Sequence, residues 1–411
     1  MNKRRIRVCA VVFSVVTVML LISTLSQAAE TIKIAFIAPF TGMFGSLGDQ
    51  DKKHFDLLLE DINSQGGVLG RKFEMHYYDN KNAPNDTIFQ FKRAVADGVR
   101  IIIQTHSSGA TNALNEAVRK HNARNPDQRV IFLCFDTTDP HLNNDKCNFW
   151  LFHFGHNADQ RIEGLVRYLA SDKAIKKLYL INMDYSHGHG CSEASRQLMK
   201  KYRPDVEIVG DVFHPVGKIK DFSPHINAIR DSGADAVLTG DWGTDLQLLI
   251  KEAHRSGLKA KWATIYAGVL GTPTALGEAG EGTLQITKWH INYNDGDNET
   301  TKFALRFRKK YEMDMYYQGI NTMMKMLCNA IEKTKSTKAI DLAYALEGMK
   351  IQIPTGEFLM RAEDHQAVAP QIVSVFSKGV KYDAENTGLG WKTVMVVPPI
   401  DVPTTCKMER P

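Results

Sequence analysis

Short apolar segments rich in β-branched residues alternate with segments whose apolar residues recur at helical spacing. Residues 100–104 are of the first type, because Ile101, Ile102 and Ile103 follow one another as in a strand buried on both faces of a parallel sheet. A helix over 110–125 follows directly. The same alternation predicts strands over 31–38, 72–79 and 130–135 and helices over 50–65 and 85–97. This order predicts an α/β fold, with helices on both faces of a parallel sheet.

The alternation starts again near residue 149 and predicts a second sheet. We expect strands over 149–154, 177–182, 206–213, 236–239, 261–266 and 281–286, with helices over 158–171, 191–202, 222–232 and 244–256 between them. Helices over 300–311, 316–333 and 340–347 and strands over 356–360, 371–378 and 392–397 follow. We therefore expect two doubly wound lobes, residues 29–150 with 285–350 and residues 151–284 with 351–411. Three connections between the lobes predict a hinge.

The first 28 residues have the pattern of a secretory signal peptide. Lys3, Arg4, Arg5 and Arg7 precede an apolar run from Val8 to Leu25, and the small residues Ser26 and Ala28 follow it. An uncleaved membrane anchor is the alternative, but hydroxyl residues within the run weaken it. We expect residues 1–28 to be removed and the rest of the chain to be exported and soluble.

The expected removal of residues 1–28 changes both the net charge and the number of cysteines. Removing residues 1–28 takes away four Lys/Arg and no acidic residue, so the net charge falls from +5 to +1. A nearly neutral chain argues against binding to nucleic acid or to anionic membranes. Five cysteines then remain, so at least one is unpaired, and we expect Cys134 and Cys147 to pair first because they flank one loop.

Small polar residues follow the strand at 100–104. The hydroxyls of Ser107, Ser108 and Thr111 and the free backbone N–H groups of the next helix can together hold an anion such as a carboxylate. The alternative is that one of these hydroxyls only caps the helix.

The sequence gives little support for a metal site or for a hydrolytic triad. His187, His189 and Cys191 alternate with glycines and lack the spacing of the common structural zinc sites, so we expect no metal there. Ser108, His187 and Asp136 are the residue types of a hydrolytic triad, but the chain has no Gly-x-Ser-x-Gly elbow. We therefore expect a protein without catalytic activity and without a cofactor.

Several motifs, in order along the chain, resemble the periplasmic leucine/isoleucine/valine-binding proteins, which are type I solute-binding components of ABC importers. The residues that carry the resemblance are Pro39–Gly42, Asp61–Gly70, Ser107–Thr111, Thr137–Pro140 and His187–Gly188. The resemblance covers nearly the whole chain after residue 28. It implies two lobes joined by a three-segment hinge, with the ligand held between them.

Carried over to this sequence, the resemblance implies ligand contacts from both lobes. The first lobe would contribute Ser107, Ser108, Asp136, Thr138, Phe44 and Leu47, and the second would contribute His187, Trp242 and Tyr266. Leucine-type members have a glutamate for the ligand's α-ammonium where Tyr266 stands here. An unpaired buried ammonium is costly, so either Asp136 or Asp241 replaces that glutamate or the ligand has no ammonium.

The resemblance implies a periplasmic protein that captures a small polar solute by hinge closure and delivers it to an ABC permease in the inner membrane. We expect a monomer whose ligand is a branched-chain or related amino acid. Short amides, urea and aromatic carboxylates are alternative ligands. A ligand-sensing receptor subunit and, more distantly, a small-amide hydrolase are alternative functions.

Overall fold

The first lobe is built on a five-stranded parallel sheet in the order β2-β1-β3-β4-β5. The computed structural model describes residues 30–42 and 44–411, so the expected signal peptide lies outside the described residues. The strands are β1 (Ile32–Ala38), β2 (Phe73–Asp79), β3 (Ile101–Ile103), β4 (Ile131–Cys134) and β5 (Leu151–His153), with helices α2 (Gly45–Ser64), α3 (Pro84–Ala96) and α4 (Ser108–Arg124) between them. Ile101–Ile103 is buried throughout, as its apolar sequence predicts.

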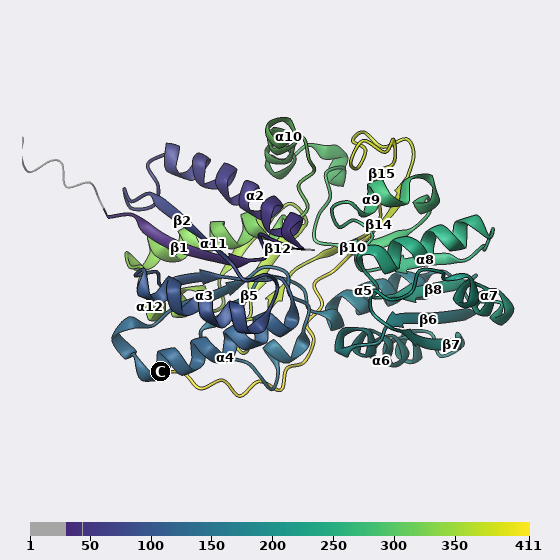
Figure 1. Ribbon diagram of the computed structural model, residues 1–411, viewed down its shortest axis with the longest axis horizontal. Helices are drawn as coiled ribbons and strands as arrows, with labels where there is room; N and C mark the ends of the chain where they lie inside the picture. The colour runs from purple at the N-terminus through teal and green to yellow at the C-terminus, as the bar shows by residue number, and fades with distance from the viewer. Residues whose placement is uncertain (1–29, 43) are drawn as a thin grey trace, which may run out of the picture.

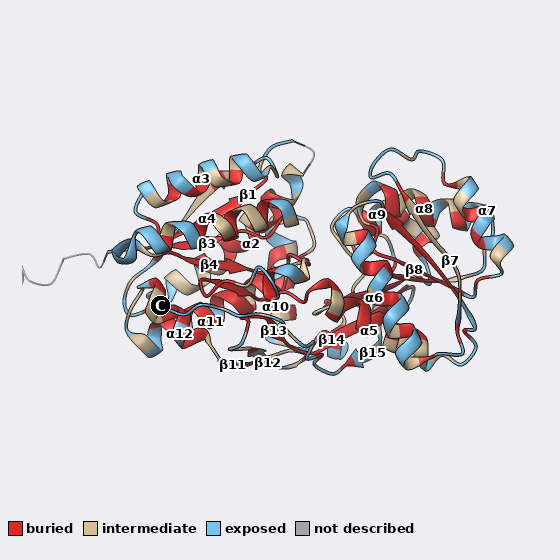
Figure 2. Cartoon of the chain, turned by 90° about the horizontal axis from the view of Figure 1, so that it is seen from below, coloured by how far each residue is buried: buried red, intermediate tan, exposed pale blue. Residues whose placement is uncertain are grey.

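The second lobe is built on a seven-stranded sheet in the order β15-β14-β10-β9-β8-β6-β7. Its strands are β6 (Lys177–Met183), β7 (Glu207–His214), β8 (Ala236–Thr239), β9 (Lys261–Thr264), β10 (Leu284–Thr287), β14 (Gln371–Ser377) and β15 (Gly390–Val397). Helices α5 (Ala158–Ser171), α6 (Ser186–Tyr202), α7 (Ser223–Ser232), α8 (Gly243–Arg255) and α9 (Thr272–Leu276) belong to this lobe. Figures 1 and 2 show the two lobes side by side, each with buried strands and exposed outer helix faces. The predicted α/β fold is confirmed.

The chain passes between the sheets after β5, after β10 and before β14. Helix α10 (Glu299–Tyr311) follows the second passage and packs on α2. Helices α11 (Gly319–Thr334) and α12 (Ala339–Leu346) contribute to the core of the first lobe. Among the helices of the described residues, none has the length and hydropathy that a bilayer crossing requires.

The expected lobe boundaries are wrong at two places. Strand β10 belongs wholly to the second sheet, although residues from 285 onward were expected in the first lobe. A small antiparallel sheet of β11 (Lys350–Ile353), β12 (Gly356–Met360) and β13 (Ala367–Val368) follows α12. Its buried Phe358 and Met360 join the core of the first lobe, so the last passage lies near residue 370 and not near 350.

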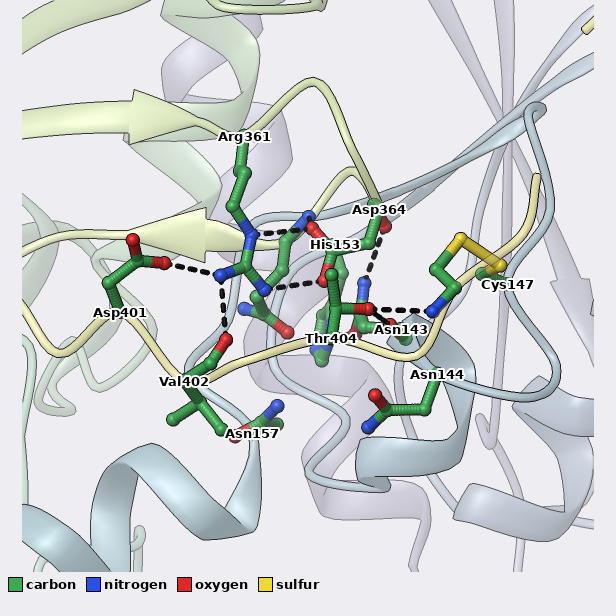
Figure 3. Close-up of polar contacts among 12 residues, drawn as sticks. Asn143, Asn144, Cys147, His153, Asn157, Arg361, Asp364, Asp401, Val402 and Thr404 are labelled. Atoms are coloured by element: carbon green, nitrogen blue, oxygen red, sulfur yellow. Dashed lines mark hydrogen bonds and ion pairs between the residues drawn. A yellow bond between two sulfur atoms is a disulfide. The ribbon is translucent and has the colours of Figure 1, made fainter.

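Residues 398–411, which we call the C-terminal strap, contact both lobes. Ile400 is buried in the core of the second lobe, and Met408 packs against the core of the first. Between them, Arg361 bonds to Asp401 and donates to the Val402 carbonyl at 2.7 Å, while the Thr404 hydroxyl donates to the Asn143 carbonyl at 2.6 Å (Figure 3). The strap therefore adds a fourth link between the lobes.

A disulfide between Cys147 and Cys406 fixes the strap to the first lobe. The expected Cys134–Cys147 pair is wrong. Cys134 ends β4 inside the core, where its thiol lies 3.6 Å from the Thr105 hydroxyl. A buried strand residue cannot reach a loop cysteine without breaking its packing.

Candidate ligand-binding site

Thr138 lies where the two lobes meet. It follows β4 in the first lobe, and its hydroxyl oxygen is 3.2 Å from the Tyr266 hydroxyl and 3.5 Å from His187 Nδ1. Both partners belong to the second lobe, after β9 and at the start of α6. The structure therefore brings together three of the predicted site residues, and the lobes touch at this point.

Aromatic side chains line the same junction. Trp242 precedes α8, and its indole N–H donates to the Tyr185 hydroxyl at 2.9 Å. The Phe44 ring of the first lobe lies 5.8 Å from the Trp242 ring, and the Tyr185 ring lies 5.7 Å from that of His187. These rings form a wall on which an apolar part of a ligand can pack.

His187 is the second residue of α6, although we expected a loop and a helix from Cys191. Helix α6 begins early because Gly188 lets it approach the end of β6: a Cβ at position 188 would lie 2.0 Å from the Met183 carbonyl oxygen. Burial lowers the pKa of His187 from 6.5 to about 4, so its imidazole is neutral at pH 7.

The neighbouring His189 points elsewhere, since it is exposed and bonds to Asp184 at 2.9 Å. Within residues 30–42 and 44–411, no group of three or more His, Cys, Asp or Glu is placed to hold a metal ion.

Asp136 forms an ion cluster with two cations at the base of the junction. Its Oδ1 accepts from Arg161 Nη2 at 2.5 Å and lies 3.3 Å from Lys288 Nζ. The three side chains are 14%, 6% and 13% exposed, respectively. Burial alone would raise the pKa of Asp136, but the two cations outweigh it and hold the pKa below its ordinary value. The carboxylate is therefore ionised and is shared by two basic side chains, although burial lowers the pKa of Lys288.

A cavity adjoins this cluster. Asp136, Arg161, Lys288, Tyr316 and Tyr317 are among the residues that line it, and the cavity is small, about 20 Å³ in volume. The guanidinium carbon of Arg161 also lies 5.8 Å from the Tyr266 ring, which contacts Thr138. Arg161 therefore connects the cavity to the Thr138–Tyr266 contact between the lobes.

Three hydroxyl residues after β3, Ser107, Ser108 and Thr111, differ in their hydrogen bonding. Ser107 has a φ of 68° and accepts from the Ala110 N–H at 3.4 Å, so it caps α4. Thr111 is fully buried and bonds to Gln104 and Thr137, which contradicts a direct contact with an anion. The half-buried Ser108 begins α4, and its hydroxyl has no hydrogen bond within the described residues.

Two further expectations need correction. Asp241 is fully buried, where it bonds to His214 at 2.7 Å and accepts from the Met183 N–H at 2.7 Å, so it does not face the junction. Residues 44–47 were expected in a loop, but α2 begins at Gly45 and Leu47 is half-buried in its first turn. A Cβ at Gly48 would lie 2.0 Å from the Pro39 carbonyl oxygen, so this glycine permits the early start.

A sequence model described as "Periplasmic binding protein" matches residues 31–379. The chain belongs to the periplasmic binding protein family. It is 33% identical over 399 residues to the Leu/Ile/Val-binding protein homolog 4 of Brucella melitensis, with 93% of this chain and 94% of that protein covered. The family is one of substrate-binding proteins and not of enzymes.

Solved structures of periplasmic binding proteins have the same fold. A leucine-, isoleucine-, valine-, threonine- and alanine-binding protein of Brucella ovis, in a closed conformation, superimposes with a TM-score of 0.86 at 31% identity, covering 93% of this chain and all of the other. A solute-binding protein of an ABC transporter from R. palustris, in complex with benzoate, superimposes with a TM-score of 0.75 at 17% identity, covering 92% and 99%.

Within the described residues, Ser108, His187 and Asp136 do not form a catalytic triad. His187 contacts Thr138 and Cys191, and Asp136 contacts Arg161 and Lys288, so neither forms a hydrogen bond with Ser108. In a hydrolase with such a triad, the nucleophile is hydrogen-bonded to the base, and the base is hydrogen-bonded to the carboxylate.

Arg161 and Lys288 were not predicted as site residues. Lys288 directly follows β10, the same kind of strand end that indicated Asp136, so the strand pattern contained a usable signal. Arg161 stands in the first turns of an amphipathic helix, where a charged residue usually faces solvent. Its burial could not be read from the helical pattern.

Proposed function

We propose that this protein is the substrate-binding component of an ABC importer and captures a small organic solute between its lobes. Contact of Thr138 with Tyr266 and His187 carries the proposal, because a ligand at this junction would touch both lobes and favour the closed population. Membership in the periplasmic binding protein family supports it. An inner-membrane permease would then recognise the closed form.

The ligand that the comparisons favour is an amino acid or a related organic acid. Relatives are named for leucine, isoleucine and valine, and one protein with the same fold binds benzoate. The aromatic wall suits the apolar part of such molecules, and the polar groups at Thr138 and Ser108 suit their polar end. We place the working protein in the periplasm as a monomer, after removal of residues 1–28.

A thermal-shift screen of the chain from residue 29 tests this proposal. Aliphatic amino acids, aromatic acids, short amides and urea would each be added in excess, and a ligand at 100 times its dissociation constant should stabilise the fold by about 2.7 kcal/mol. We expect a shift without chemical turnover of the ligand. Steady release of ammonia or acid from any bound compound would contradict a pure binding function.

The variant Thr138→Val tests whether a ligand that raises the melting temperature binds at the Thr138 junction. Removing the hydroxyl that joins the lobes should weaken ligand binding several-fold, since one hydrogen bond contributes about 1 kcal/mol. Thr334→Val is the matched control, because its hydroxyl bonds only within and just after α11, to Ala330 and Ser336. Equal affinities of the two variants would place the ligand elsewhere.

A further inference from the structure

The ion cluster at the junction contains two basic side chains and one carboxylate. Arg161 and Lys288 share a single oxygen of Asp136, and both cations are almost fully buried. Arg161 Nε donates to the His156 carbonyl at 3.0 Å, and Lys288 Nζ donates to the Phe135 carbonyl at 2.6 Å. These carbonyls orient the cations but do not neutralise them. A buried cation without an anion of its own is unfavourable, and a second anion would provide one.

Residues that line the same cavity carry free hydrogen-bond donors. The hydroxyls of Tyr316 and Tyr317, which line the adjoining cavity, have no hydrogen bond within the described residues, and neither does Arg161 Nη1. Position 319 is glycine, where a Cβ would lie 2.8 Å from Lys288 Nζ. Gly319 therefore leaves room beside Lys288, and the residues that line the cavity offer free N–H and O–H donors, which a carboxylate can accept.

The carboxylates that could bind an ammonium group are already engaged or disfavoured. Asp136 is held by two cations, Asp241 is buried against His214, and Asp139 accepts from Asn112 at 2.6 Å. Asp159 is half-buried at the start of α5, and burial raises its pKa, which disfavours its ionised form. Tyr266 and Thr138 are neutral hydroxyls bonded to each other.

We propose that the ligand is a small organic carboxylate whose anionic group is held by Arg161 and Lys288, and that binding requires no ammonium group. The inference rests on the proposed function and names the ligand class of the same site. Arg161 and Lys288 would be its specificity-determining residues. The aromatic wall of Trp242, Phe44 and Tyr185 would pack on the apolar part of the acid.

Calorimetric titration with compounds that share one carbon skeleton tests the inference. The probes are 4-methylpentanoate, leucine and 4-methylpentanamide, with benzoate and benzamide as a second set. We expect at least one acid to bind, its amide to bind at least about tenfold more weakly, and 4-methylpentanoate to bind no more weakly than leucine.

Three variants test how the charges of Lys288 and Asp136 contribute to acid binding. Lys288→Gln removes one basic side chain but keeps the Arg161–Asp136 pair, and should weaken acid binding about 10- to 100-fold without affecting the amide. Asp136→Asn should preserve or strengthen acid binding, because it removes a competing anion. Lys261→Gln is the control, since Lys261 pairs with Asp172 away from the junction and should leave binding unchanged.

Each contrary result has a distinct meaning. Leucine binding that exceeds 4-methylpentanoate binding, and that is lost in Asp136→Asn or Asp159→Asn, would show ammonium recognition and overturn the inference. Binding of a neutral solute in the thermal-shift screen, with none of the acids, would overturn the ligand class but leave capture between the lobes intact. Absence of any ligand from that screen would overturn the proposed function as well.

Discussion

We expect His187 to make lobe closure sensitive to pH. In the closed arrangement burial lowers its pKa to about 4, against a hydrogen bond with the Gly240 backbone that raises it, and with smaller effects of Arg161, which lowers it, and Asp139, which raises it. When the lobes open, we expect the imidazole to regain solvent and a pKa near 6.5. The open form then binds the proton more tightly, so acid favours opening and affinity falls as the pH decreases from 6.5 to 4.

Calorimetry at pH 7.5, 6.0 and 5.0 measures this effect. We expect an affinity loss that approaches tenfold per pH unit in the wild-type chain, and a flatter profile in His187→Gln. Aromatic and α-amino carboxylates stay mostly ionised at these three pH values, so with such a ligand the carboxylate contributes little. The same slope in both proteins would mean that another group controls closure.

At the scale of single elements, the alternation of strands and helices was predictable, but two helix starts were not. Helices α2 and α6 begin about five residues before the expected positions, in Gly45–Gln50 and Ser186–Gly190. These turns contain glycine and polar residues, so they lack the apolar spacing that indicates a helix. Close packing of Gly48 and Gly188 on strand ends stabilises them, and tertiary packing of this kind is not visible in a local pattern.

The positions of several predicted site residues follow from the order of the strands, whereas the direction of their side chains does not. The resemblance to leucine/isoleucine/valine-binding proteins implied Asp136, Thr138 and Tyr266, and all three follow strands, whose ends meet at one edge of a parallel sheet. That rule does not give the direction of a side chain, so Asp241 was included although it points into the core. The disulfide joins residues 259 positions apart, which only the folded chain brings together.

The first turn of α6 offers a matched pair of substitutions. In Gly188→Ala the new Cβ would clash with the Met183 carbonyl oxygen, and we expect a loss of about 1–3 kcal/mol in the free energy of unfolding. Gly190→Ala meets no atom within 4 Å and should gain up to about 1 kcal/mol, because alanine favours a helix. Urea unfolding measures both. Equal stabilities would contradict the close packing of α6 on β6.

At the scale of the whole molecule, the C-terminal strap links the second lobe to the first, and its disulfide fixes it to the first lobe. Beyond Cys406, Tyr344 donates to the Pro411 carbonyl at 3.0 Å, and Arg410 bonds to Glu347 at 2.9 Å. Cys406→Ser should lower the free energy of unfolding by about 2–4 kcal/mol, because the cross-link restricts the unfolded chain.

Thermal unfolding with and without a thiol reductant tests the contribution of the disulfide. The reductant should destabilise the wild-type protein and leave Cys406→Ser unchanged. Cys328→Ser is the control, since Cys328 is a free thiol and its replacement should keep the response to the reductant. A wild-type protein that is indifferent to reduction would contradict a stabilising strap.

We propose that the lobes close around a ligand at the Thr138 junction. Small-angle X-ray scattering of the chain from residue 29 tests it directly, before and after saturation with the tightest ligand from the thermal-shift screen. We predict a smaller radius of gyration with ligand, and a bound scattering curve that matches this structure, in which Thr138 contacts Tyr266 and His187. An unchanged radius of gyration in the presence of a bound ligand would contradict capture by closure.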